Sequence, residues 1–316
     1  MSKSPASLPP AIALLGPTAS GKTDLAVRLV RELPVEIISV DSVMVYREMD
    51  IGSAKPGPGI LAEAPHRLID FLDPAEACSA ARFAELARRE MAEISAAGRI
   101  PLLVGGTMLY FRALIHGLSR LPAADETLRA RLAQEGVERG WAAMHARLGE
   151  VDPPAAERIH PNDPQRIQRA LEVYELTGVP LSQLQQQNEP LPWRFVKLAL
   201  IPSDRAVLHE RIADRFAQML EQGLVDEVEA LFARGDLDEQ MPSIRAVGYR
   251  QLWHYLQGRI NYTQMQEQGV AATRQLAKRQ LTWLRSESGV QPFDALDQKR
   301  EDQVLKWLAS SPIDTE

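Results

Sequence analysis

Cysteine is almost absent from this chain of 316 residues, because Cys78 is the only one. A single thiol excludes an internal disulfide framework and any zinc site built from cysteines, and it is typical of proteins from a reducing compartment. The sequence also lacks a run of 18 or more apolar residues, so we expect no membrane-spanning segment. The N-terminal residues lack the long apolar stretch of a secretory signal, and we therefore expect a cytoplasmic protein.

Excess basic charge and clustered histidines are also missing. The formal net charge is −6, so a nucleic-acid partner would have to bind a local basic patch rather than the whole molecule. The six histidines are scattered, without a pair at the i, i+4 spacing of many metal ligands. No internal repeat or low-complexity segment is evident. These absences leave a globular protein that is long enough for two domains.

The segment GPTASGKT at residues 16–23 is the strongest signal that is present. It matches Gly-x-x-x-x-Gly-Lys-Ser/Thr in full, between an apolar strand candidate at 11–15 and a helical pattern at 24–30. Its glycines permit a tight turn that points successive N–H groups at one anion, and the helix directs its positive dipole end there. An ordinary glycine-rich turn is the alternative. The pattern predicts polyphosphate binding by Gly16, Pro17, Thr18, Ala19, Ser20, Gly21, Lys22 and Thr23, with the Thr23 hydroxyl suited to Mg²⁺.

Strand and helix signals alternate in the first part of the chain. Strands are expected at 35–40 and 101–104, with a helix at 79–97 between them, which is typical of a parallel sheet with functional loops at its strand C-termini. The strand signal disappears from 120 to 195, and a further strand is expected at 196–201. We therefore predict an α/β fold. It consists of a core of the P-loop NTPase type (residues 1–119 and 196–316, with C-terminal basic helices) and an inserted all-helical domain (residues 120–195).

Arg215 interrupts the apolar stripe of a helix expected over 204–222. It falls on the same side of that helix as Leu208, Ile212 and Met219. A guanidinium in such a position needs an anion. The anion is either a core carboxylate in an internal salt bridge or the phosphate ligand of the loop, and the sequence leaves both possibilities open.

Three segments concentrate basic residues within this acidic protein. Residues 271–286 contain four basic residues and no acidic one, while 164–169 and 243–250 add arginines near turns. A solvated basic face is the usual explanation of such a run. Arginine and glutamine in groups, with Tyr249 nearby, also suit phosphate contact and the stacking of an unstacked RNA base. Both explanations stay open at this point.

Several strings of the sequence, in their order, resemble the signature motifs of bacterial tRNA dimethylallyltransferases. The similarity runs from residue 11 to about residue 286. The strings are residues 41–56, 65–70, 104–110, 160–166, 247–250 and the basic helix from 272. Departures are few: many members carry Gln at Met44, Gly at Glu48, Thr at Ser53 and a second His at Arg67. Met44 matters most, because it removes a polar side chain from a segment expected to approach the RNA.

The resemblance implies transfer of the dimethylallyl group from its diphosphate to N6 of adenosine 37 in the anticodon stem-loop of tRNA. Asp41 would accept the N6 proton, Thr18 and Arg215 would contact the diphosphate in the loop, and Thr23 would hold Mg²⁺. It implies no membrane and no obligate protein partner. The tRNA-binding residues would be Asp41, Ser42, Val43, Met44, Thr107, Gln165, Arg166, Ile167, Gln168, Arg169, Arg245, Gly248, Tyr249, Arg250, Arg274, Lys278, Arg279 and Arg285.

Three other functions remain as alternatives. In a kinase or ATPase the loop would bind ATP, and Asp41 would help to organise Mg²⁺. A prenyltransferase acting on free AMP or ADP would share the chemistry, but the inserted domain and the basic segments favour a large RNA. An RNA-binding module without catalysis would not need Asp41.

Overall fold

The computed structural model describes residues 8–117, 119, 121–185 and 191–311. Contacts divide the chain into two compact units, one of Met1–Leu114 and Pro192–Glu316 and the other of Ile115–Leu191. The sequence placed the inserted domain at 120–195, and the second unit begins and ends a few residues before those positions. Within the described residues, none of the helices is long and apolar enough to cross a membrane.

A six-stranded sheet forms the centre of the first unit, and all of its pairings are parallel. The order is β3-β2-β4-β1-β5-β6. Strands β1 and β4 are almost entirely buried, which fits their unbroken apolar sequences, since helices cover both faces of a parallel sheet. The predicted α/β class is confirmed. The strands are β1 (Pro10–Leu15), β2 (Val35–Val40), β3 (His66–Arg67), β4 (Ile100–Gly105), β5 (Arg194–Ile201) and β6 (Val290–Asp294).

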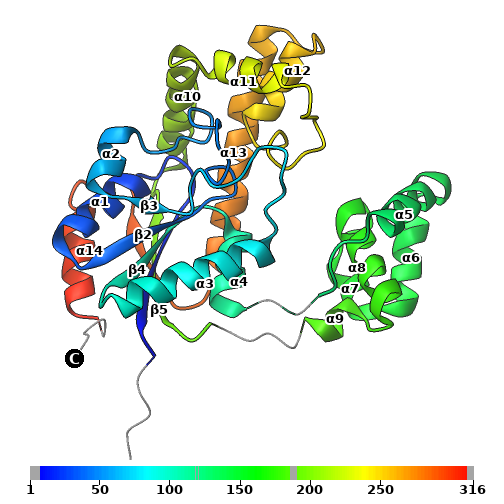
Figure 1. Ribbon diagram of the computed structural model, residues 1–316, viewed down its shortest axis with the longest axis horizontal. Coiled ribbons are helices and arrows are strands. Elements are labelled where there is room, and N and C mark those ends of the chain that lie inside the picture. The colour runs from blue at the N-terminus through cyan, green and yellow to red at the C-terminus, as the bar shows by residue number, and fades with distance from the viewer. Residues whose placement is uncertain (1–7, 118, 120, 186–190, 312–316) are drawn as a thin grey trace, which may run out of the picture. The chain divides into compact units, whose positions relative to one another are not determined.

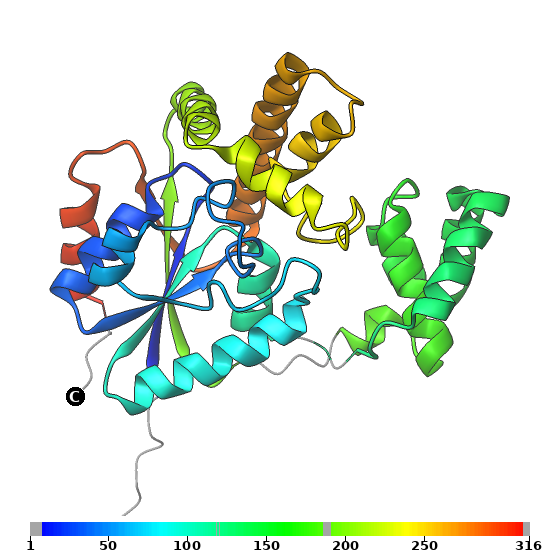
Figure 2. The same ribbon diagram turned by 45° about the horizontal axis from the view of Figure 1, so that its top comes forward.

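Helices cover the two faces of the sheet (Figures 1 and 2). On one face α1 (Lys22–Glu32) and α14 (Arg300–Ala309) pack together over a core that includes Leu25 and Leu308. On the other face α3 (Ala80–Ala96) buries residues at helical spacing, from Phe83 to Ile94, and begins at the Ser79 cap. Shorter helices are α2 (Pro58–Glu63) and α4 (Met108–His116).

Four further helices form a second core within the first unit. They are α10 (Arg205–Glu221), α11 (Leu224–Ala233), α12 (Tyr249–Leu256) and α13 (Tyr262–Ser286). This core also contains Val45, Tyr46 and Met49 from the loop after β2, so the helices hold that loop in place. Helix α13 is long enough to run from the group of α11 and α12 down to the sheet (Figures 1 and 2). It therefore reaches both the helical core and the phosphate loop.

Within its described residues, the second unit contains helices and loops and no strand. Its helices are α5 (Glu126–Arg139), α6 (Trp141–Val151), α7 (Pro153–Arg158), α8 (Pro164–Thr177) and α9 (Leu181–Leu184). They enclose a core of their own that includes Leu132, Met144, Leu148 and Leu171. These helices agree with the loss of the strand signal from this part of the sequence.

Candidate functional site

The phosphate loop joins β1 to α1 in the shape that its sequence predicts. Gly21 takes a φ of +80°, which an L side chain rarely adopts, and caps α1. Gly16 has no room for a side chain, because a Cβ there would lie 2.9 Å from the Leu200 carbonyl oxygen. Ala19 also lies in the left-handed region, with a φ of 61°. The loop is thus a strained turn at the start of a helix, the arrangement that binds phosphate anions.

The ammonium group of Lys22 folds back over this loop. Its Nζ donates to the carbonyl oxygens of Gly16 at 3.0 Å and Pro17 at 2.6 Å. Burial and the neighbouring Arg215 guanidinium lower the pKa of Lys22 to about 7, against the opposing effect of Asp41. An anion bound here would stabilise the charged form of Lys22.

Arg215 carries a partly buried guanidinium without a partner. Among the described residues it forms no hydrogen bond and no ion pair within 4.0 Å. Burial lowers the pKa of Arg215, and only the more distant charges of Asp41 and Asp24 oppose this shift. The internal salt bridge considered from the sequence therefore has no carboxylate to form it. The other possibility considered from the sequence, a phosphate ligand, stays a prediction.

Asp41 follows β2 directly, beside the neighbouring strand end that carries Thr107. Its Oδ1 accepts from the backbone N–H groups of Val43 at 2.8 Å and Met44 at 3.2 Å. The Ser42 N–H donates to Thr107 Oγ1 at 3.0 Å, which joins the ends of β2 and β4. No hydrogen bond to Asp41 Oδ2 occurs within the described residues. One carboxylate oxygen thus orients the group, and the other is available to a substrate.

Charge interactions place Asp41, Lys22 and Arg215 in one site, because Arg215 and Asp41 both shift the pKa of Lys22 and Asp41 also shifts the pKa of Arg215. The Met44 side chain turns toward β2, where its sulfur accepts from Ser39 Oγ at 3.6 Å. The departure at Met44 thus places a thioether against the strand, where many relatives carry an amide.

The described residues contain no group of three or more His, Cys, Asp or Glu side chains suited to a metal. Mg²⁺ often binds through one or two protein oxygens together with substrate phosphates and water. Thr23, in the first turn of α1, fits that pattern as a single hydroxyl ligand beside the loop.

Two residues beside the phosphate loop are not among those predicted from the sequence. Gln280 of α13 accepts a hydrogen bond from the Thr18 N–H and donates one to the Gly106 carbonyl oxygen, both at 2.9 Å. The guanidinium of Arg300 lies beside the loop, since a Cβ added at Gly21 would be 3.5 Å from its Nη2. Gln280 could have been found from its position among the buried residues Ala277, Leu281 and Leu284 of one helix face. Arg300 gives no comparable signal.

Seven of the predicted tRNA contacts are exposed side chains. Lys278, Arg279 and Arg285 lie on α13, and within the described part of the chain none of them forms an ion pair. The same holds for Arg245 and Arg250 of the segment before and within α12. The exposed residues are Gln165, Arg166, Arg245, Arg250, Lys278, Arg279 and Arg285. The charges of Arg245, Arg250, Lys278, Arg279 and Arg285 are therefore free to meet phosphate groups, whereas Arg166 lies 3.4 Å from the Asp163 carboxylate.

Three predicted tRNA contacts are wrong, because the residues are buried. Tyr249 is 0% exposed and donates its hydroxyl hydrogen to Glu227, so its ring cannot stack on a base. Gly248 is buried beside it, with its N–H bound to Gln251 Oε1. Ile167 is 0% exposed in the core of the second unit. All three are part of the scaffold.

Three other predicted contacts already serve the scaffold with their polar groups. Arg169 binds Glu172 and the Pro122 carbonyl oxygen, while Gln168 Nε2 donates to the Arg129 carbonyl oxygen. Arg274 donates to the His209 carbonyl oxygen at 3.3 Å. Each lies partly exposed, so only a fraction of the side chain is available to a ligand.

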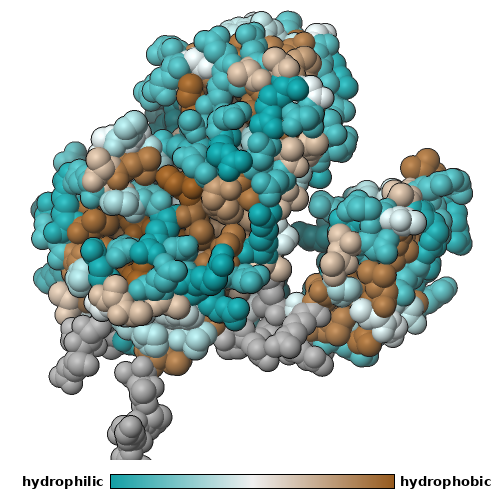
Figure 3. Space-filling model, in the orientation of Figure 1, coloured by the Kyte–Doolittle hydropathy of each residue, from teal (hydrophilic) through white to brown (hydrophobic). Residues whose placement is uncertain are grey.

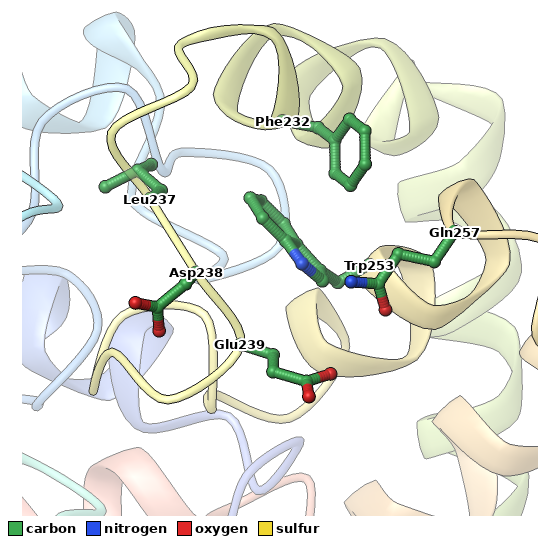
Figure 4. A pocket seen from close by; sticks show the side chains of 6 residues that line it. All are labelled: Phe232, Leu237, Asp238, Glu239, Trp253 and Gln257. Carbon is green, nitrogen blue, oxygen red and sulfur yellow. The ribbon is translucent and has the colours of Figure 1, made fainter.

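The surface over helices α10–α13 is mainly polar. Hydrophilic residues predominate over α10–α13 on the face shown in Figure 3. A separate hollow lies among α11, α12 and the loop between them, where the Phe232 and Trp253 rings meet edge to face (Figure 4). It is lined by Phe232, Leu237, Asp238, Glu239, Trp253 and Gln257. None of the predicted site residues lines this hollow.

Comparison with known proteins agrees with the motifs. The family model described as IPP transferase matches residues 44–287, and that described as isopentenyl transferase matches residues 10–69. The tRNA dimethylallyltransferase of Thioalkalivibrio sulfidiphilus is 67% identical over 288 residues, which are 90% of this chain and 90% of that protein. The tRNA dimethylallyltransferase of Alkalilimnicola ehrlichii is 60% identical over 305 residues, 95% of this chain and 96% of that protein.

A solved structure shares the fold as well. The full-length tRNA isopentenylpyrophosphate transferase of Bacillus halodurans matches with a TM-score of 0.71 at 39% identity, covering 95% of this chain and 96% of that one. The resemblance inferred from the motifs is confirmed. The chain belongs to the IPP transferase family.

Proposed function

We propose that this protein transfers the dimethylallyl group of dimethylallyl diphosphate to N6 of adenosine 37 in tRNA and releases diphosphate. The observation that carries this proposal is the joint placement of Lys22, Arg215 and Asp41. Two cations without carboxylate partners flank a phosphate loop, and a carboxylate with one free oxygen lies in the same site. The family membership and the names of the relatives support the same activity.

The geometry suggests a role for each group. The diphosphate would bind in the loop, where Lys22 and Arg215 offset the charge that develops on it as the C1–O bond breaks. The adenine would leave the anticodon stack to reach the site, as bases do in enzymes that modify them. Asp41 Oδ2 would accept a proton from the N6 amine as nitrogen attacks C1 of the prenyl group.

We include Mg²⁺ in the proposal, held by Thr23 together with diphosphate oxygens and water. When bound, the ion would neutralise part of the charge on the leaving group. The exposed cations of α13 and of residues 245–250 would contact the tRNA backbone. The expected compartment is the cytoplasm, which the single cysteine supports.

A transfer assay tests the proposal. The protein is mixed with Mg²⁺, dimethylallyl diphosphate labelled in the prenyl group and unmodified tRNA with A36-A37, with parallel reactions that contain AMP or ATP alone. We expect label in tRNA and none in AMP. Label in AMP would show that a free nucleotide, not tRNA, is the acceptor. Consumption of ATP without any transfer would indicate a kinase or ATPase instead.

A further inference from the structure

Gln280 links the phosphate loop to the basic helix through a single buried amide. It lies in the C-terminal third of α13 and is 7% exposed. Its Oε1 accepts from Thr18 N–H and its Nε2 donates to the Gly106 carbonyl oxygen. Three elements therefore meet at one side chain: the loop after β1, the turn after β4 and α13.

The two partners fix both the identity and the orientation of this side chain. A backbone N–H can only donate and a carbonyl oxygen can only accept, so the amide has one satisfied orientation. Glutamate could not donate to Gly106 at neutral pH, and leucine could satisfy neither group. Gly106 has no space to spare, because a Cβ there would lie 2.4 Å from Gln280 Nε2.

The contact falls where the phosphate loop is most strained. Thr18 directs its N–H at Gln280, and the next residue, Ala19, holds a φ of 61°. Such conformations persist only when the surroundings enforce them. The same amide fixes Gly106, which is adjacent to Thr107 and thus to the contact with the segment that carries Asp41.

From this geometry we propose that Gln280 is a positioning residue, which holds the phosphate loop in its diphosphate-binding shape and sets that loop in register with the basic helix. Lys278 and Arg279 precede it directly on α13 and point to solvent. The helix that presents cations to RNA thus also orders the loop that holds the prenyl donor. This inference rests on the proposed function, because it takes the anion bound in the loop to be a diphosphate.

The first test compares Gln280→Leu with Gln275→Leu, a matched change at an exposed glutamine of the same helix. Inorganic pyrophosphate binding is measured by calorimetry well below the unfolding temperature, together with tRNA affinity and the transfer kinetics. We expect Gln280→Leu to weaken pyrophosphate binding about tenfold and to raise KM for dimethylallyl diphosphate more than it lowers kcat. Unchanged pyrophosphate affinity, or an equal loss of tRNA affinity, would overturn the proposal.

A second variant, which leaves Gln280 in place, keeps the test decisive if Gln280→Leu folds poorly. Gly106→Ala places a methyl group against the amide and should break the same contact from the other side. Unchanged pyrophosphate affinity in Gly106→Ala alone would overturn the proposal. Two changes that act through one contact are not additive, so the double variant should bind pyrophosphate no more weakly than the worse single variant. Additive losses would show that Gln280 does not act through Gly106. Pyrophosphate binding is read without transfer, so this test stands even if the transfer assay fails.

Discussion

The hydroxyl of Tyr249 donates to Glu227 Oε1 at 2.6 Å, inside the helical core. The same carboxylate accepts from the backbone N–H groups of residues 50–52, at distances of 2.7 to 3.1 Å. A Cβ on Gly52 would lie 2.6 Å from the Tyr249 ring. Two of the family motifs, at 41–56 and 247–250, therefore meet at one carboxylate, so residues 50–52 and Tyr249 serve the fold.

Replacement of this carboxylate should cost more stability than loss of the phenol. Glu227→Ala leaves three loop N–H groups without their acceptor and should lower the free energy of unfolding by about 3 kcal/mol, whereas Tyr249→Phe should cost about 1 kcal/mol. Urea denaturation measures both. Tyr249→Phe should keep full tRNA affinity, while Arg250→Gln, next to it but exposed, should weaken binding. A drop in tRNA affinity for a stably folded Tyr249→Phe variant would restore a contact role to the ring.

Removal of the Lys22 charge should stabilise the free protein even though it destroys the anion site. The folded pKa of Lys22, about 7, lies below the ordinary lysine value of 10.5. Between these two pKa values the unfolded chain therefore keeps a proton on Lys22 that the folded chain has released. The free energy of unfolding of the wild type rises with pH across this window. We expect Lys22→Met to be about 1–3 kcal/mol more stable near pH 7, with the gain shrinking toward pH 10. A loss of stability at pH 7 would show that the Lys22 hydrogen bonds outweigh its desolvation.

Pyrophosphate binding near pH 8 should transfer a proton to Lys22. Most Lys22 side chains are neutral at that pH in the free protein, and a bound anion raises the pKa of Lys22 toward its ordinary value. Calorimetry in buffers of different ionisation enthalpy gives the number of protons taken up. Pyrophosphate itself also titrates, so the comparison is with Lys22→Arg, whose side chain is always charged. We expect the wild type to take up close to one proton more than this variant, and equal values would contradict the lowered pKa.

The sequence was sufficient where the chemistry is local or periodic. The phosphate loop is a contiguous motif, Asp41 follows a strand, and Arg215 breaks a regular apolar stripe, so each could be found without a structure. Tyr249 could not be assigned correctly, because its partner Glu227 lies on another helix and a motif does not reveal burial. The partners of Gln280 could not be predicted, because they lie 262 and 174 residues away and only the folded chain brings them to this side chain.

Glu48 occupies a position where many relatives carry glycine, and its backbone explains that preference. Its φ is 64°, in the left-handed region that disfavours residues with a Cβ. Its only ion pair within the described residues is a long one, 3.5 Å to Arg234, at an exposed site. We expect Glu48→Gly to raise the free energy of unfolding by about 0.5 kcal/mol, the relief of strain less the entropy cost of glycine. Glu48→Ala removes the same ion pair but keeps the strain, so it should be less stable than Glu48→Gly in urea denaturation; the reverse order would refute the strain argument.

Asp41→Asn should separate catalysis from binding. Asparagine can still accept the N–H groups of Val43 and Met44, so the turn after β2 should keep its shape. It cannot accept a proton from the adenine amine, and the rate of transfer in a single turnover should fall by about 10²–10⁴ while tRNA affinity stays within about twofold. Asp24→Asn is the matched control, because Asp24 also contributes negative charge at Arg215 but is not placed to act as the base. If both variants slowed transfer equally, Asp41 would act through charge on Arg215, and the base would have to be sought elsewhere in the site.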